Sequence, residues 1–316
     1  AATGVELFAY VPHAVRSRLS ALTANPYTHV YSVDGAPAVG DVFVGGSWRT
    51  YLVSGMAAGA RGLFALDVTQ AGAVNEANAG SVARWEVADA DIGHVFGRPI
   101  LAKMRDGRWR AIVGNGVNSA NGRAVLVLVD LETGAVGKID TMAGSAAAPN
   151  GLSAVSVVSQ HDDGVADFAF AGDLQGNLWK FDLSAASAAS WKVALGSAAV
   201  PQPLFTAPAG QPITARPGVT RATGGGWMVV VGTGRYIDVG DNGAGAAQAL
   251  YGIRDLGVRV TLAELQPQSV VATPVAGGIS YRVTTHAVGR PADALLAGDN
   301  AISPEDYGGS RRGWRM

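Results

Sequence analysis

Four segments of the chain repeat one pattern of apolar and polar positions. Each has an apolar run, a Gly-rich turn, a second apolar run and then an aspartate. The aspartates are Asp67, Asp130, Asp182 and Asp255. Short apolar runs bounded by turn residues are typical of β-strands joined in hairpins. Because the aspartates recur about 50 to 75 residues apart, the pattern favours a β-propeller, in which each blade packs against its neighbours.

The third segment shows the pattern most clearly. Its sequence, FAFAGDLQGNLWKFDLS from Phe168 to Ser184, reads as a strand, a turn and a second strand. The first four residues are apolar, and Gly172 to Asn177 supply glycine and asparagine, which tolerate a positive φ. We therefore predict a tight β-hairpin here.

Little of the chain outside these segments has a helical pattern. Pro12 to Ala24 places a proline at a plausible first turn and apolar residues at mixed helical spacing, which predicts one short helix. Residues 290–316 contain Arg311, Arg312 and Arg315 near their end and few apolar positions. We expect an incomplete blade or a loose tail there.

Composition narrows the possible functions. The 316 residues include 43 glycines and only 16% charged residues, which suits many short strands joined by tight turns. A net charge of −1 favours neither nucleic acid nor an anionic membrane surface, and no apolar run is long enough for a transmembrane helix. The absence of cysteine excludes disulfides and thiolate metal sites in this chain. The chain begins at Ala1 rather than Met, so we expect a processed or engineered piece of a larger protein.

Long stretches of the chain, spread over residues 5–255, resemble the PilY/PilC-type β-propellers of bacterial type IV pili. The matching runs are LFAYVPHAV (Leu7 to Val15), VDGAPAVGDVFVGGSWRTYLVSGMAAGARGLFALDVT (Val33 to Thr69), WEVADADIGHVFGRP (Trp85 to Pro99), AIVGNGVNSANGRAVLVLVD (Ala111 to Asp130), AGDLQGNLWKFDLS (Ala171 to Ser184) and VVVGTGRYIDVGD (Val229 to Asp241). The resemblance implies an all-β fold, an irregular propeller of seven blades that is incomplete here. Residues 1–316 would form one propeller domain, and a larger N-terminal region, often von Willebrand A-like, would be absent.

The resemblance also implies a function that is not enzymatic. PilY-type proteins act with minor pilins in a pilus tip complex, where they promote pilus assembly, oppose retraction, support twitching motility and contribute to adhesion to host or abiotic surfaces. By resemblance, this protein would be exported through the periplasm to the bacterial cell surface, at the pilus tip. The propeller would present a rigid body whose loops make the contacts.

A candidate calcium site precedes the third hairpin. Calcium binds several oxygen ligands, with a glycine at the sharp turn of a calcium loop. With Gly164 at that turn, Asp163 and Asp167 would give carboxylates and Val165 a backbone carbonyl. Ser159 and His161 stand where the family usually has Asp or Asn, and imidazole is a poor calcium ligand. We expect calcium, bound more weakly than by a full ligand set, to order this loop and regulate contacts; the alternative is an Asp-Gly turn that needs no metal.

Other polar clusters are better explained by architecture. The four repeat aspartates are expected to cap turns in different blades. Glu86, Asp89, Asp91 and His94 could suggest acid–base chemistry, but their segment reads as an inter-blade loop. The histidines lack the spacing of a zinc site, and the tryptophans near strand ends are expected to pack between blades.

Two alternative functions stay open at this point. The run LVDLETGAV, from Leu128 to Val136, resembles a blade motif of quinoprotein dehydrogenases, in which calcium clamps a cofactor. Only one such motif is present, and the chain has no vicinal cysteine pair. A carbohydrate-binding propeller that uses exposed tryptophans is the other alternative.

Overall fold

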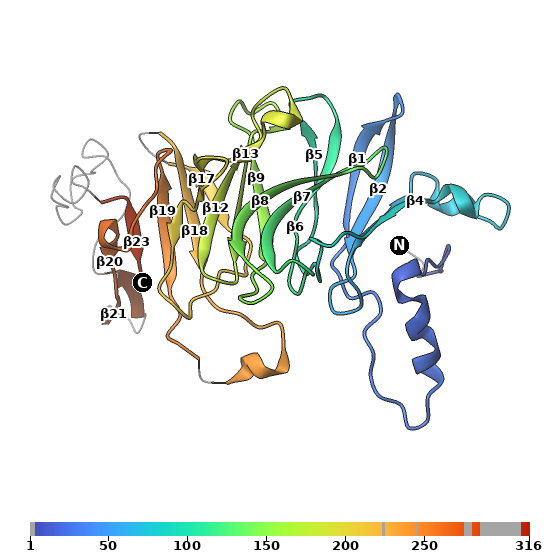
Figure 1. The fold of residues 1–316 in the computed structure, drawn as a ribbon, viewed down its shortest axis with the longest axis horizontal. Coiled ribbons are helices and arrows are strands. Elements are labelled where there is room, and N and C mark those ends of the chain that lie inside the picture. Colours follow the sequence, from blue (N-terminus) through green and yellow to red (C-terminus); the bar gives the residue numbers. More distant parts are fainter. Residues whose placement is uncertain (1–3, 223–224, 244, 275–279, 285–310) are drawn as a thin grey trace.

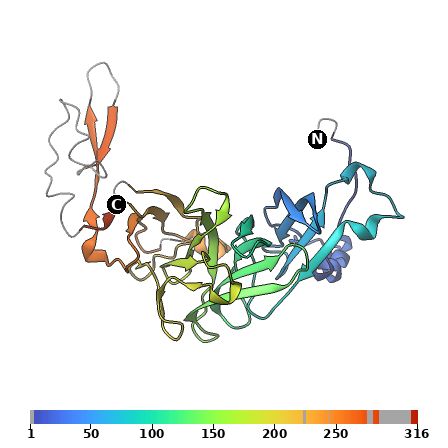
Figure 2. The same cartoon turned by 90° about the horizontal axis from the view of Figure 1, so that it is seen from above.

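The computed structural model describes residues 4–222, 225–243, 245–274, 280–284 and 311–316. Their architecture is built almost entirely from β-strands, and the larger sheets follow one another in sequence order (Figure 1). Seen from above, the sheets form a curved row with the N-terminal sheet at one end and the C-terminal strands at the other (Figure 2). In the described residues, no helix is long and apolar enough to cross a membrane.

Four sheets of four or five strands make up most of this row. The first contains β1 (Ala38–Val44), β2 (Ser47–Gly55), β3 (Leu63–Asp67) and β4 (Ala83–Val87). The second contains β5 (Ile100–Met104), β6 (Trp109–Gly114), β7 (Arg123–Asp130), β8 (Val136–Gly144) and, on the edge of β5, β10 (Val165–Ala166). The third contains β9 (Leu152–Val158), β11 (Phe168–Asp173), β12 (Asn177–Asp182), β13 (Lys192–Val193) and β16 (Phe205–Thr206). The fourth contains β17 (Gly218–Arg221), β18 (Trp227–Gly232), β19 (Leu250–Asp255), β20 (Gln266–Pro267) and β23 (Gly313–Arg315).

Smaller elements connect or flank these sheets. Two short hairpins pair β14 (Leu195–Gly196) with β15 (Pro201–Gln202) and β21 (Val270–Pro274) with β22 (Ser280–Thr284). The described helical turns are all 3-10: η1 (His13–Thr23), η2 (Ala71–Ala73), η3 (Ala79–Ser81), η4 (Ala188–Ser190), η5 (Val239–Asn242) and η6 (Leu262–Glu264).

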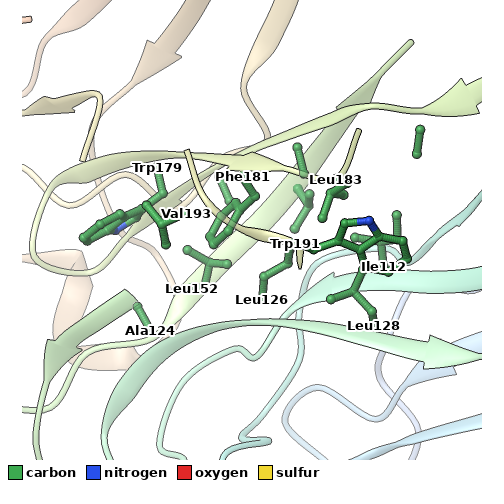
Figure 3. Close-up of a cluster of buried hydrophobic side chains, with 14 of the residues drawn as sticks. Ile112, Ala124, Leu126, Leu128, Leu152, Trp179, Phe181, Leu183, Trp191 and Val193 are labelled. Atoms are coloured by element: carbon green, nitrogen blue, oxygen red, sulfur yellow. The ribbon is translucent and has the colours of Figure 1, made fainter. Parts of the chain in front are cut away.

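The central strands are buried on both faces because the sheets pack against one another. In β7, RAVLVLVD, every residue after the first is buried, so its side chains serve the cores on both sides of the second sheet. One of these cores gathers side chains from the second and third sheets, including Leu126, Leu152, Trp179 and Phe181 (Figure 3). Such continuous burial explains why the strands read as apolar runs rather than alternating ones.

The repeat pattern predicted from the sequence is confirmed. Strands β3, β7, β12 and β19 each end at one of the four repeat aspartates, and each belongs to a different sheet. The predicted hairpin is β11 and β12, with Gly176 in its turn at φ 83°. A Cβ at Gly176 would lie 2.7 Å from the backbone oxygen of Gln211, so both backbone conformation and space call for glycine.

The structure confirms the helix predicted near the N-terminus and corrects part of the prediction for the C-terminal segment. The expected short helix is η1, a 3-10 helix preceded by Pro12, and its Val15 is buried in a small cluster with Phe64. For the C-terminal segment, the sequence predicts an incomplete blade or a loose tail, and the loose tail is wrong for residues 313–315, which form β23 and pair with β19 and β20. Residues 290–310 of that segment lie outside the described residues. The sequence signal was weak because β23 is short and pairs with strands distant in sequence.

Candidate functional site

The predicted calcium loop joins β9 to β11 and extends to the neighbouring sheet. Its two-residue strand β10 pairs in parallel with β5, placing Val165 opposite Lys103 and Ala166 opposite Met104. Gly164 has a φ of 74°, which allows the sharp turn before β10. The loop therefore belongs to the third sheet by sequence and to the edge of the second by hydrogen bonding.

Two of the three carboxylates of the loop, those of Asp163 and Asp167, bind the same arginine. Arg105, in the turn between β5 and β6, donates from Nε to Asp167 Oδ1 at 2.6 Å and from Nη2 to Asp167 Oδ2 at 2.8 Å. Its Nη1 donates to Asp163 Oδ2 at 2.7 Å. The Asp167 side chain is only 1% exposed, so the guanidinium compensates a buried negative charge.

Neighbouring donors hold both aspartates in the ionised form. The backbone N–H of Val165, together with Arg105 and Ser159, lowers the pKa of Asp163 to about 2. Burial alone would raise the pKa of Asp167, but hydrogen bonds from Arg105 and from the backbone N–H of Gln160 hold it below its usual value. The two carboxylates in turn raise the pKa of the Arg105 guanidinium.

The remaining predicted ligands do not complete an oxygen cage. Ser159 donates its hydroxyl to Asp163 at 3.0 Å. The backbone N–H of Val165 also donates to Asp163, while His161 is exposed. The described part of the chain contains no group of three or more His, Cys, Asp or Glu residues that could hold a metal.

A resident calcium ion does not fit this arrangement. Calcium takes 6–8 oxygen ligands, and here the carboxylates of Asp163 and Asp167 are directed at guanidinium and backbone N–H donors. The predicted calcium occupancy stays a prediction. Sequence reasoning missed Arg105, which lies 58 residues before Asp163 and carries no local signal of its partner.

Asp173 explains why the third hairpin has its signature sequence. This carboxylate is fully buried at the end of β11. It accepts hydrogen bonds from the backbone N–H groups of Gln175 and Asn177 and from the side chains of Asn150, Asn177 and Trp179, all at 2.8–2.9 Å. The Asp, Asn and Trp of GDLQGNLW are thus parts of one buried polar network.

Asn115 has a comparable role in the VGNG run. Its side-chain N–H groups donate to the backbone oxygens of Asp91 and Arg123, and its oxygen accepts from the backbone of Val125 and Leu152. Leu152 begins β9, so this buried amide connects the second and third sheets. The glycine-rich run therefore has a structural role in joining these sheets.

The repeat aspartates cap turns, as predicted. Asp67 accepts from the backbone N–H and hydroxyl of Thr69, and Asp182 does the same with Ser184. Asp130 binds Thr133 in this way, and Asp255 accepts from the backbone N–H of Gly257. Short polar side chains after a strand commonly stabilise turns by such bonds.

The acidic residues at the end of β4 and between β4 and β5 are held by structural partners. Lys138 bridges Asp89 and Asp91 at 2.9 and 2.8 Å. Glu86 instead accepts hydrogen bonds from the Tyr10 hydroxyl and the His13 backbone. The ring of His94 contacts the backbone oxygen of Ala57 at 2.6 Å. These contacts match the inter-blade loop that the sequence predicted.

Tryptophan side chains serve mainly the sheet interfaces. The indole N–H groups of Trp85 and Trp191 donate to the backbone oxygens of Leu131 and Ala185. Trp48 differs, because it is 63% exposed next to the β1–β2 turn and packs edge-on with Phe43. Exposed aromatic side chains of this kind are frequent in protein–protein contacts.

The family profile of the PilY1 beta-propeller domain matches residues 8–270. The chain belongs to the PilY1 β-propeller family. The type IV pilus biogenesis factor PilY1 of Pseudomonas aeruginosa PAO1 is 40% identical over 277 residues, 80% of this chain and 23% of that protein. A PilY1 homolog of Xylella fastidiosa is 41% identical over 274 residues, 80% of this chain and 18% of that protein.

A solved PilY1 structure supports the same assignment. The crystal structure of the Pseudomonas aeruginosa PilY1 C-terminal domain matches with a TM-score of 0.75 and 32% sequence identity, covering 99% of this chain and 66% of that one. The all-β PilY1-type propeller predicted from the sequence is confirmed, while the number of seven blades stays a prediction. The PilY1 relatives are named for pilus biogenesis rather than for catalysis, which favours neither the quinoprotein nor the lectin alternative.

The chain spans about a quarter or less of the length of the curated PilY1 relatives, 23% and 18% in the two cases. The activities of those whole proteins are therefore only proposed for this chain.

Proposed function

We propose that this chain is the propeller of a type IV pilus biogenesis factor that acts outside the cell at the pilus tip, without enzymatic activity. The family match over residues 8–270 carries the proposal. The PilY1 proteins it resembles are named as type IV pilus biogenesis factors. The bacterial surface, reached through the periplasm, is the corresponding location.

The architecture suits a rigid binding body. Neighbouring sheets share apolar cores and are tied by buried polar side chains such as Asn115. Loops on such a scaffold can be held in fixed positions without their own core. Minor pilins of the tip complex are the proposed partners of these loops, and the bound propeller would promote assembly and oppose retraction.

Twitching motility and adhesion to host or abiotic surfaces are the finer parts of the proposal. The exposed aromatic pair Phe43 and Trp48 supports a contact role for the β1–β2 hairpin. Calcium regulation at Ser159–Asp167 is not carried into the proposal, because Arg105 already binds the carboxylates of Asp163 and Asp167 in that loop.

The proposal can be tested in the bacterium that makes the protein. Deleting the codons for residues 8–270 in the full-length gene should remove surface pili and twitching. Inactivating the retraction motor in the same strain separates the two proposed roles, because pili should return if the propeller mainly opposes retraction. Normal surface pilin and normal twitching in the deletion strain, with the truncated protein produced, would reject the proposal.

A further inference from the structure

The loop between β9 and β11 is held by arginines from the sheets on both of its sides. Arg105 reaches it from the β5–β6 turn of the second sheet. Arg221, the last residue of β17 in the fourth sheet, donates to Asp162 Oδ1 at 2.9 Å and to the backbone oxygen of Gln160 at 2.8 Å. The loop, which belongs to the third sheet, therefore contacts the second sheet through the β5–β6 turn and the fourth sheet through the end of β17.

The two arginine contacts differ in burial. Asp162 is 79% exposed, so its pair with Arg221 lies in water and contributes little on its own. Asp167 is buried, and Arg105 binds both of its oxygens with two N–H groups in the fork geometry that guanidinium shares with carboxylate. The contact with Arg105 is therefore the one on which the loop depends.

The positive charge of the Arg105 guanidinium compensates the carboxylates of Asp163 and Asp167, as a bound cation would. Two carboxylates converge on it, and they would repel each other without a positive charge between them. Because Arg105 belongs to the second sheet and the loop to the third, the ion pairs also connect the two sheets. A dissociable ion would make this connection depend on ion concentration, whereas an arginine is always present and always charged.

We propose that Arg105 is a built-in cation that replaces calcium in the loop of residues 159–167, so that the loop holds the second and third sheets together independently of calcium. The inference concerns this chain's own residues and stands apart from the proposed pilus function.

The first test uses the unmodified chain. Its Tm, followed by differential scanning fluorimetry, should be the same in chelator and at about 10 mM calcium, roughly ten times the weakest dissociation constants of extracellular calcium sites. Calorimetric titration should give no calcium heat that depends on the loop. A calcium heat that is present in the unmodified chain and lost in Asp163→Asn would overturn the proposal.

The second test removes the built-in cation. Arg105→Gln should lower the Tm in chelator, and added calcium should raise it again, because the freed Asp163 and Asp167 can share the metal. Magnesium at equal concentration controls for ionic strength. Arg105→Lys keeps the charge but loses the fork, so its Tm should lie between those of Arg105→Gln and the unmodified chain.

A matched control lies in the same turn. Arg108 pairs with the buried Asp130 at 2.5 Å. Glu132 and Asp106 act on Arg108 only through their charge, and among the described residues no second carboxylate is hydrogen-bonded to its guanidinium as on Arg105. Arg108→Gln should therefore lose stability without becoming calcium-responsive. An Arg105→Gln chain as stable in chelator as the unmodified one would contradict the assignment of Arg105 as the cation that orders the loop.

Discussion

The signature residues of the third hairpin are explained by their hydrogen bonds to one buried side chain, that of Asp173. Asp173 accepts five hydrogen bonds at the turn of the third hairpin, two of them from backbone N–H groups. The strand–turn–strand pattern could be predicted from local residues because turn chemistry is local. The central role of Asp173 in this turn could not be predicted from local residues, because its partner Asn150 lies 23 residues away and only the fold brings the two together.

Replacing Asp173 with alanine should cost about 3 kcal/mol or more of unfolding free energy. The substitution leaves the buried indole N–H of Trp179 and neighbouring amides without their charged acceptor. Urea denaturation measures the loss. Asp182→Ala is the matched control, because Asp182 only caps an exposed turn with Ser184 and its loss should cost about 1 kcal/mol. Equal costs for the two variants would contradict the assigned role of Asp173.

The contact of Arg105 with its two aspartates also predicts a pH dependence. Both carboxyl groups have a lowered pKa in the folded chain, to about 2 for Asp163. Lowered carboxyl pKa values give stability that is complete above the unfolded value of about 3.9 and is lost as pH falls through the folded value. The charge of His161, the other titratable group facing Asp167, also favours ionised Asp167.

The stability difference between the unmodified chain and Arg105→Gln should therefore be constant from about pH 5 to 7 and shrink between about pH 4 and pH 2. Urea titrations over this range measure it. A difference that stays the same down to pH 2 would show that Arg105 acts without its carboxylate partners.

Elements are joined across sheet boundaries by contacts that no local pattern reveals. Strand β10 pairs with β5 of the preceding sheet, and β23 pairs with β19 from about 60 residues later in the chain. The sequence predicted the hairpins within sheets because apolar runs and turns lie next to each other. It did not predict these edge pairings, in which strands of two or three residues carry too little pattern to be recognised.

Lys180 on β12 and Asp255 at the end of β19 join the third sheet to the fourth. Their Nζ and Oδ2 atoms lie 2.6 Å apart, both side chains are buried, and the ammonium also lies 4.3 Å from the ring centroid of Phe168. Lys180→Met should lower the free energy of unfolding by about 3–5 kcal/mol, because it leaves Asp255 as an uncompensated buried charge. Chemical denaturation measures the loss.

The double variant Lys180→Met, Asp255→Asn tests this reasoning. Removing the stranded charge while keeping an oxygen for the Gly257 N–H should recover much of the loss. If the double variant were less stable than Lys180→Met by the full cost of a second independent substitution, the two residues would not be coupled.

At the scale of the whole molecule, the sheets succeed each other in a curved row (Figure 2). Neighbouring sheets share apolar cores. Repeats that contact only their neighbours derive their stability from each repeat and from the interfaces between adjacent repeats. The fold class was readable from the sequence because the repeat period and the family resemblance agreed. The calcium prediction used the loop residues alone, and the opposing Arg105 became visible only when two sheets were placed side by side.

The central claim is that this chain is a PilY1-type propeller with the proposed role in pilus biogenesis, and an exchange of segments tests it most directly. Residues 1–316 would replace the matching segment of Pseudomonas aeruginosa PilY1, with the whole chain used because β23 completes the fourth sheet. Surface pilin sheared from cells would be compared with strains carrying native PilY1 and PilY1 lacking that segment. The account predicts that the chimera restores surface pili. A chimera that is produced, exported and protease-resistant, yet gives no more surface pilin than the deletion, would contradict it.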